Sequence, residues 1–213
     1  MADIYLSGIR ILENEVNAKT ALTQVDPARR TAAAQIKEPK KRAQSLAAGL
    51  LVQHAARERL GDAAPAGIYE IVTGEKGKPY FKDFPDLHFS ISHSGQMVLV
   101  ALSDRVVGAD IQEWKELKAD IAGRFFHPKE TAYLRGLPAS ASEKAFFDLW
   151  CLKESYIKYT GEGLSQPLDE LDFTPVLQGG GFAVFEFTED SSRIRAELIT
   201  APHGYSAAVI EAF

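Results

Sequence analysis

The sequence predicts a protein of the α+β class, because long helical patterns stand apart from segments that alternate like antiparallel strands. Residues 146–159 place apolar side chains at helical spacing, and Gly161 lies where such a helix would end. Residues 87–102 alternate like two strands that meet in a turn. After Gly163 the chain has the pattern of an antiparallel meander with little ionisable chemistry, which indicates a scaffold.

The composition is that of an ordinary globular protein and excludes several classes. The chain has 213 residues, a formal net charge of -5 and 46% hydrophobic residues. Mild acidity argues against a general nucleic-acid binder, which would carry a basic domain. The single cysteine, Cys151, cannot form an internal disulfide or a thiolate metal cage, and we expect it to be a small buried residue. The sequence shows no secretory leader and no membrane-spanning run, so we expect a cytoplasmic protein.

The first part of the chain is expected to hold a strand and then helices. Residues 1–12 begin with the alternation of a strand, although the register blurs toward their end. Asp26 and Pro27 form a helix start, with the aspartate as N-cap and the proline at the first helical position. Pro39 is expected to divide the helical stretch, and its second piece, 43–60, carries leucines at core spacing.

The stretch after Pro27 is basic in a chain that is otherwise mildly acidic. Against the single acid Glu38 stand six cations: Arg29, Arg30, Lys37, Lys40, Lys41 and Arg42. Such a run is either a solvated helix face or a patch that binds a phosphorylated ligand or an acidic partner. The residues alone leave both interpretations open.

Two turns combine small residues with groups that can meet an anion. Residues 74–80, which follow a possible short strand at 68–72, place Lys76 and Lys78 among glycines. Residues 90–95 combine three serine hydroxyls with an imidazole. A serine–histidine nucleophile pair is the competing interpretation of the second turn, but no Gly-x-Ser-x-Gly elbow is present.

Several acids are candidates for a metal site. Residues 106–112 have the pattern of an apolar strand that contains Asp110, and Glu154 lies on the long helix. Together their carboxylates could supply the hard oxygen ligands that Mg²⁺ prefers. Lys158 follows Glu154 by four residues, so both side chains project from one helix face, either as a surface ion pair or as the lining of a polar cleft. Glu130 is a third candidate acid.

The region between these acids is expected to be helical, then irregular. Residues 120–134 look helical, with Pro128 at the start of their second half. Residues 139–142 have the composition of a small polar linker, and Ser142 is a candidate N-cap for the helix that follows.

Four blocks of this sequence occur in a recognisable order. They are residues 89–95, 107–111, 125–130 and 150–158, and two shorter stretches, 77–79 and 161–165, accompany them. Together they resemble the 4'-phosphopantetheinyl transferases of the surfactin-synthetase type. The resemblance implies two similar α+β lobes in pseudo-twofold arrangement, each with a small antiparallel sheet and helices. Those lobes would be residues 1–104 and 105–213, with the active site in the cleft between them.

The resemblance also implies a reaction and its partners. The enzyme would transfer the 4'-phosphopantetheine group from coenzyme A to a serine hydroxyl of an apo acyl or peptidyl carrier protein, with Mg²⁺ and with release of 3',5'-ADP. We expect a monomer that binds neither nucleic acid nor membranes. The main alternative is a non-catalytic module that binds coenzyme A or a carrier protein. A hydrolase that uses Ser94 or Cys151 with His93 lacks both the elbow and a third member.

By the same resemblance, five residues form the catalytic centre. Asp110 and Glu154 would hold Mg²⁺ and Lys158 would contact a phosphate, while Gln112 would complete the metal site through its amide oxygen or through a water. Glu154 is expected to act as a metal ligand with possible general-base duty, and Glu130 as a support or alternate base. Many relatives carry an acid where this chain has Gln112, so we expect weaker metal binding or a changed preference among divalent ions.

A second set is expected to contact coenzyme A. Its members are Arg29, Lys41, Arg42, Gly77, Lys78, Pro79, Ser92, His93 and Lys158. The stretch 77–79 would lie against the adenine, and His93 near the 3'-phosphate or its neighbour. The choice among the basic residues after Pro27 stays open at this point.

Overall fold

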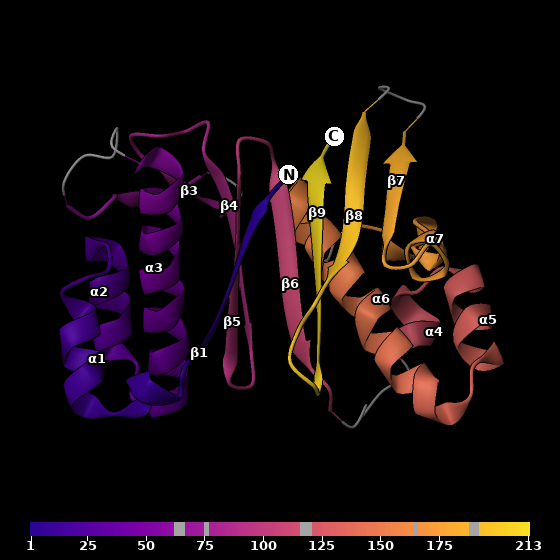
Figure 1. The fold of residues 1–213 in the computed structure, drawn as a ribbon, viewed down its shortest axis with the longest axis horizontal. Helices are drawn as coiled ribbons and strands as arrows, with labels where there is room; N and C mark the ends of the chain where they lie inside the picture. The colour runs from indigo at the N-terminus through magenta and orange to yellow at the C-terminus, as the bar shows by residue number, and fades with distance from the viewer. Residues whose placement is uncertain (62–66, 75–76, 116–120, 164–165, 188–191) are drawn as a thin grey trace. The chain divides into compact units, whose positions relative to one another are not determined.

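The computed structural model describes residues 1–61, 67–74, 77–115, 121–163, 166–187 and 192–213. The chain divides into two compact units, Met1–Val106 and Val107–Phe213 (Figure 1). Lys76, Asp120 and residues 164–165, which entered the expectations above, lie outside the described residues.

The first unit contains a three-stranded antiparallel sheet and a separate two-stranded hairpin. The sheet order is β1 (Asp3–Gly8), β5 (Met97–Ser103) and β4 (His88–Ser94). The hairpin pairs β2 (Ile71–Thr73) with β3 (Pro79–Phe81). The strand pair expected within 87–102 is confirmed, and the short strand expected at 68–72 lies slightly later in the chain.

Two helices of the first unit, those that begin at Pro27 and Pro39, form where the sequence predicts them, and two shorter ones before them were not predicted. In chain order the unit contains a 3-10 helix (Arg10–Glu13), α1 (Glu15–Leu22), α2 (Pro27–Gln35) and α3 (Pro39–Leu60). Asp26 caps α2 by accepting a hydrogen bond from the Arg29 backbone N–H at 3.0 Å. Pro39 opens α3, which packs against the sheet through buried side chains such as Leu46 and Val52. The 3-10 helix accounts for the blurred register after the first strand.

The second unit is a four-stranded antiparallel sheet covered by helices (Figure 1). Its strand order is β6 (Val107–Glu113), β9 (Tyr205–Ala212), β8 (Arg193–Ile199) and β7 (Phe182–Glu186). Its helices are α4 (Ile121–Phe125), α5 (Pro128–Gly136), α6 (Ala139–Thr160), a 3-10 turn (Leu168–Glu170) and α7 (Thr174–Gln178). Antiparallel sheets with separate helices confirm the expected α+β class.

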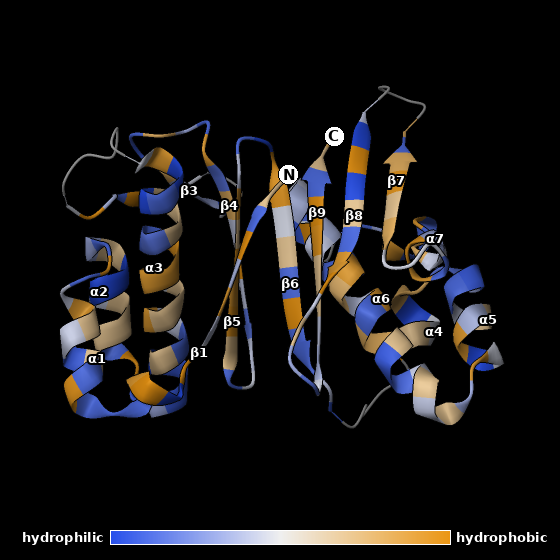
Figure 2. Cartoon of the chain, in the orientation of Figure 1, coloured by the Kyte–Doolittle hydropathy of each residue, from blue (hydrophilic) through white to orange (hydrophobic). Residues whose placement is uncertain are grey.

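Helix α6 organises the second unit, because it packs against both β6 and β9. Its inward side carries fully buried residues that include Leu149, Cys151 and Leu152. Gly161 ends the helix in the left-handed region, with φ 72°, and its N–H bonds the Ile157 carbonyl at 2.8 Å. Figure 2 shows hydrophobic and hydrophilic residues alternating along β8, as a sheet with one buried face requires.

Two expectations about the second unit are wrong. Residues 139–142 are not a linker, because α6 already begins at Ala139, after Pro138. Ser142 is therefore not the N-cap, and its hydroxyl donates to the Leu134 carbonyl of α5 at 3.4 Å. Alanine favours a helix and the serines do not interrupt it, so α6 begins about one turn before the expected start, in a stretch whose residues 139–141 are exposed.

Among the helices that the structure describes, none is both long and apolar enough to cross a membrane.

Candidate active site

The acids and the lysine of the second unit meet where α6 lies directly on β6. Gly108 makes this approach possible. A Cβ atom at that position would lie 2.1 Å from the Ser155 carbonyl oxygen and 2.4 Å from the Tyr159 backbone nitrogen. Any larger residue would push the helix away from the strand. The glycine therefore sets the spacing that brings Lys158 of α6 to Asp110 of β6.

Asp110 is the centre of this site. Its side chain is 2% exposed, and its Oδ1 lies 2.7 Å from the Lys158 ammonium. The same ammonium donates to the Ala109 carbonyl at 3.1 Å. The amide nitrogen of Gln112 donates to the Oδ2 of Asp110 at 2.9 Å. Lys158 therefore joins helix to strand, and the interpretation as a solvent-exposed pair does not describe it.

Glu154 lies one helical turn before Lys158 and is half-buried. Burial raises the pKa of Glu154, and the negative charge of Asp110 raises it further, while the Lys158 ammonium lowers it. Two carboxylates that influence each other in this way favour a cation between them.

The donor set fits a divalent cation such as Mg²⁺ on chemical grounds. No cluster of three histidine, cysteine, aspartate or glutamate side chains occurs in the part of the chain that the structure describes. A site at Asp110 and Glu154 would therefore draw its other ligands from the amide oxygen of Gln112, from water or from a substrate. Mg²⁺ commonly binds in this way, with one or two carboxylates plus waters and phosphates.

Glu130 and Lys153 form a second charged pair, which is fully buried. Both side chains are 0% exposed and the ammonium lies 2.8 Å from the carboxylate. Glu130 also accepts the backbone N–H groups of His127 and Phe173, each at 2.8 Å, and completes a capping box at the start of α5. Burial raises the pKa of Glu130 and lowers that of Lys153. This geometry suits the support role expected for Glu130.

Lys153 binds more than its acid. Its ammonium donates to the Leu168 carbonyl at 2.7 Å and to the Leu171 carbonyl. The lysine thus ties α6 to the start of α5, to the 3-10 turn and to the residue that follows this turn. Sequence reasoning assigned no role to Lys153. The one available signal is a lysine on an otherwise apolar helix, which must find partners if it is buried.

The three basic candidates of the first unit differ in what they contact. Arg29 donates to the Ser45 carbonyl at 3.1 Å, and burial lowers its pKa. It therefore helps to pack α2 against α3. Arg42 pairs with Glu15 and its side chain is 15% exposed. Lys41 pairs with Glu38 at 3.0 Å, but its side chain is 69% exposed and can reach a ligand.

The other coenzyme A candidates lie on or beside strands. Lys78 precedes Pro79, the first residue of β3, and burial lowers its pKa. Ser92 and His93 are neighbours on β4, so their side chains project from opposite faces of the sheet, the serine buried and the histidine exposed. One ligand cannot meet both side chains from the same face.

Cys151 is a buried structural residue, as expected. Its thiol donates to the Ser206 carbonyl at 3.1 Å, and burial raises its pKa well above the usual range. A thiol that resists deprotonation is a poor nucleophile. This argues against a hydrolase that uses Cys151.

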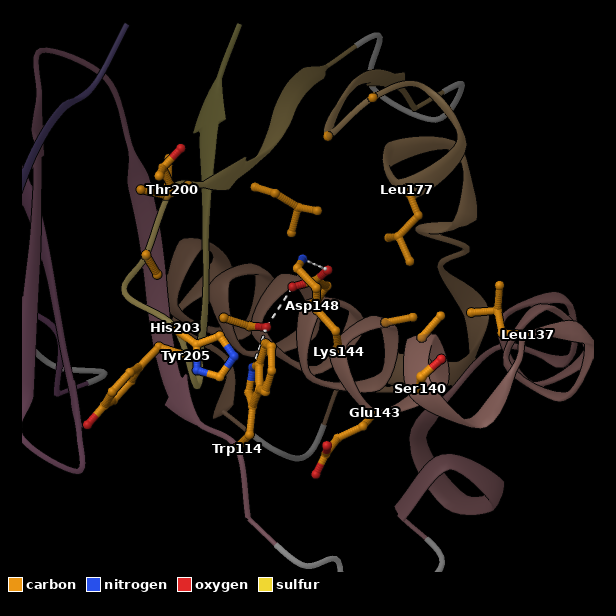
Figure 3. Close-up of a pocket in the computed structure, with 18 of the residues that line it drawn as sticks. Trp114, Leu137, Ser140, Glu143, Lys144, Asp148, Leu177, Thr200, His203 and Tyr205 are labelled. Atoms are coloured by element: carbon orange, nitrogen blue, oxygen red, sulfur yellow. Dashed lines mark hydrogen bonds and ion pairs between the residues drawn. The ribbon is translucent and has the colours of Figure 1, made fainter.

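A cavity of about 820 Å³ that sequence reasoning missed lies near the start of α6 (Figure 3). Three of the residues that line it are joined by hydrogen bonds. Trp114 donates to the Ser206 hydroxyl at 3.0 Å, and that hydroxyl donates to Asp148 at 2.6 Å (Figure 3). Lys144 then pairs with Asp148 at 2.6 Å. The one sequence signal was an aspartate within an apolar helix.

Comparisons with known proteins agree on one family. Residues 106–210 match the model of the 4'-phosphopantetheinyl transferase superfamily. A 4'-phosphopantetheinyl transferase of Bacillus subtilis is 36% identical over 79% of this chain and 73% of its own length. The transferase psf-1 of Bacillus pumilus is 32% identical over 92% of this chain and 84% of its own length. The transferase Sfp of Bacillus subtilis strain 168 is 38% identical over 66% of this chain and 62% of its own length.

Substitution of Gly108 should disturb both fold and site. Gly108→Ala places a methyl group inside the backbone of α6, so we expect the free energy of unfolding to fall by about 3 kcal/mol through overpacking. Urea denaturation measures this loss. Gly136→Ala is the matched control, since nothing lies within 4 Å of its added Cβ. Equal stability of the two variants would contradict the close approach.

Proposed function

This chain belongs to the 4'-phosphopantetheinyl transferases, and we propose that Asp110, Glu154 and Lys158 form the centre of its transfer reaction. It is an enzyme of the holo-[acyl-carrier-protein] synthase type, which moves phosphopantetheine from coenzyme A to a carrier protein. The observation that carries the proposal is the meeting of these three side chains at the contact of α6 with β6. The reaction needs charge neutralisation and in-line positioning more than covalent help.

Asp110 and Glu154 would hold the Mg²⁺, with Gln112 contributing its amide oxygen directly or through a water. The ion supplies charge neutralisation at the pyrophosphate of coenzyme A when it is bound. The half-buried position of Glu154 and the nearly complete burial of Asp110 reduce competition from bulk water. A low-dielectric position strengthens every charge contact that these residues make.

Each side chain then has a part in the displacement. Glu154 is placed to accept the proton of the incoming serine hydroxyl, a role that requires its bond to the metal to loosen during the transfer. The serine oxygen forms a bond to the β-phosphorus while the bond from that phosphorus to the bridging oxygen breaks. The electron pair leaves with 3',5'-ADP. Lys158 donates to a phosphate oxygen and offsets its charge. Glu130 would support this centre indirectly, because it pairs with Lys153, which precedes Glu154 on α6.

The coenzyme A contacts outside the second unit are part of the same proposal. Lys41 is favoured over Arg29 for a phosphate contact, because the guanidinium of Arg29 already packs α2 against α3. The stretch 77–79 and His93 keep the roles that the resemblance gives them. The division into lobes 1–104 and 105–213, the cleft between them, and a cytoplasmic monomer without nucleic-acid or membrane contact also stay predictions from the sequence.

Mass spectrometry of an apo carrier protein tests the function directly. After incubation with this protein, coenzyme A and Mg²⁺, the carrier should gain roughly 340 Da on its acceptor serine, the mass of one group delivered by this phosphoryl transfer. The same mixture with a chelator should show no gain. Binding of coenzyme A without release of 3',5'-ADP, across several unrelated carriers, would instead support the non-catalytic module.

Gln112→Glu should tighten metal binding. The substitution replaces the neutral amide beside Asp110 with a third carboxylate, and we expect the Kd for Mg²⁺ to fall about tenfold. Metal titrations of the two proteins measure the change. Gln178→Glu, at the exposed end of α7, controls for the added charge. An unchanged Kd in Gln112→Glu would exclude Gln112 from the metal site.

A further inference from the structure

Both oxygens of the Asp110 carboxylate already have cationic or N–H partners. Oδ1 is held by the Lys158 ammonium at 2.7 Å and Oδ2 by the Gln112 amide at 2.9 Å. The carboxylate is 2% exposed, so these two donors provide much of its solvation. A divalent cation that binds Asp110 must therefore replace a contact that the protein makes for itself.

We propose that Lys158 is a positioning residue that holds the metal-binding carboxylate in the ligand-free protein and releases it when a phosphate arrives, so that cation and phosphate bind cooperatively. The proposal rests on the proposed magnesium site. It adds that the binding of the cation and the binding of the phosphate are coupled through the Lys158 side chain.

The geometry gives Lys158 the means to move. Its ammonium ends a flexible four-carbon stem, and its side chain is 29% exposed where that of Asp110 is 2% exposed. Its ammonium also donates to a neutral carbonyl, that of Ala109, which a phosphate oxygen can outcompete because charge-assisted hydrogen bonds are the stronger kind. Removal of the ammonium from Asp110 without a new anion would leave a buried charge poorly compensated.

A dication cannot simply join the existing pair. The ammonium sits at hydrogen-bond distance from one oxygen of the carboxylate that would bind the cation, and like charges held at the same small carboxylate repel strongly when it is buried. Metal entry therefore favours departure of Lys158, and a phosphate that attracts Lys158 favours metal entry. The two affinities must then change by the same factor, since coupling between sites is reciprocal.

Gln112 supplies the second donor of this arrangement. Its amide nitrogen donates to Oδ2 of Asp110, whereas an ionised carboxylate at this position could only accept. The donors to Asp110 therefore include a charged one, Lys158, and a neutral one, Gln112. The Gln112 amide keeps the Asp110 carboxylate oriented while the Lys158 ammonium moves away.

Mn²⁺ serves as the probe, with free Mn²⁺ followed by electron paramagnetic resonance in the absence and presence of saturating coenzyme A, without a carrier protein. For the unmodified protein, coenzyme A should lower the Kd for Mn²⁺. Lys158→Met should bind Mn²⁺ about tenfold more tightly in the absence of coenzyme A, because one charge-assisted hydrogen bond no longer competes. The enhancement by coenzyme A should shrink in that variant.

Lys144→Met is the matched control, because it removes an ammonium that pairs with an aspartate of the same helix outside the site. It should leave both Kd values unchanged. Weaker or equal Mn²⁺ binding by Lys158→Met, or an undiminished enhancement by coenzyme A, would overturn the coupling. Absence of Mn²⁺ binding by all three proteins, even with coenzyme A, would instead overturn the magnesium site itself. Lys158→Gln provides a second variant should the methionine protein fail to fold.

Discussion

Replacement of Glu154 with glutamine is expected to lower kcat/KM for carrier-protein modification by about 10³-fold or more, because it removes a general base together with a metal-binding carboxylate. The side chain is half-buried beside Asp110, and no change of shape accompanies the substitution. The measurement is the rate at which the carrier serine gains phosphopantetheine. Since glutamine keeps the volume and a carbonyl oxygen, loss of rate would reflect chemistry rather than packing.

Two further observations separate the roles of Glu154. A fall in Mn²⁺ affinity identifies it as a ligand, while a loss of rate at saturating metal identifies it as the base. Glu143→Gln, on the exposed face of the same helix, removes an equal charge outside the site and should leave the rate unchanged. Glu154→Gln at near-normal rate would remove this residue from the mechanism and leave Glu130 as the acid to test.

Lys153→Met is expected to lower the free energy of unfolding by about 3–5 kcal/mol, because it leaves a carboxylate without its partner in the interior. Glu130 and Lys153 are both 0% exposed, so water cannot replace the missing ammonium. The carbonyls of Leu168 and Leu171 lose their donor as well. Denaturant titration with a two-state fit measures the change.

The double variant Lys153→Met with Glu130→Gln distinguishes a lost charge from lost packing. Glutamine is neutral, so it removes the unpaired buried charge, but its single amide oxygen can accept only one of the two backbone N–H groups, those of His127 and Phe173, that the two Glu130 oxygens accept. The double variant should therefore recover part of the stability and not all of it. Lys129→Met is the surface control, since that side chain is 74% exposed and should change stability little. A single variant as stable as this control would show that the buried pair contributes nothing.

The chemistry of the site was more predictable than its contacts. Residue types and spacing made Asp110, Glu154 and Lys158 candidates, and the resemblance to the family gave each its expected role. The partner of each charge could not be predicted. Consecutive positions on a helix differ by about 100° in direction, so Lys153 and Glu154 leave α6 toward different surroundings. Only the fold decides that one meets Glu130 and the other lies near Asp110.

Local signals in the sequence predicted several helix ends, but they did not predict which strands pair. Asp26 with Pro27, and Gly161, marked helix ends through backbone chemistry that needs no tertiary context. Nothing local indicates that β6 pairs with β9, almost a hundred residues later. The short α7 depends on packing, since its Thr174 and Val176 are buried against the rest of the unit.

The contact of α6 with β6 also limits how this protein can be recombined with its relatives. Helix α6 is fitted to β6 at Gly108 and is hydrogen-bonded to β9 through Ser155, whose hydroxyl donates to the Ala208 carbonyl at 3.0 Å. These three elements come from the beginning, middle and end of the second unit. A chimaera that exchanges the helix alone would join surfaces shaped for different neighbours. Functional hybrids should therefore inherit β6, α6 and β9 from one parent, and tolerate exchange of the intervening β7.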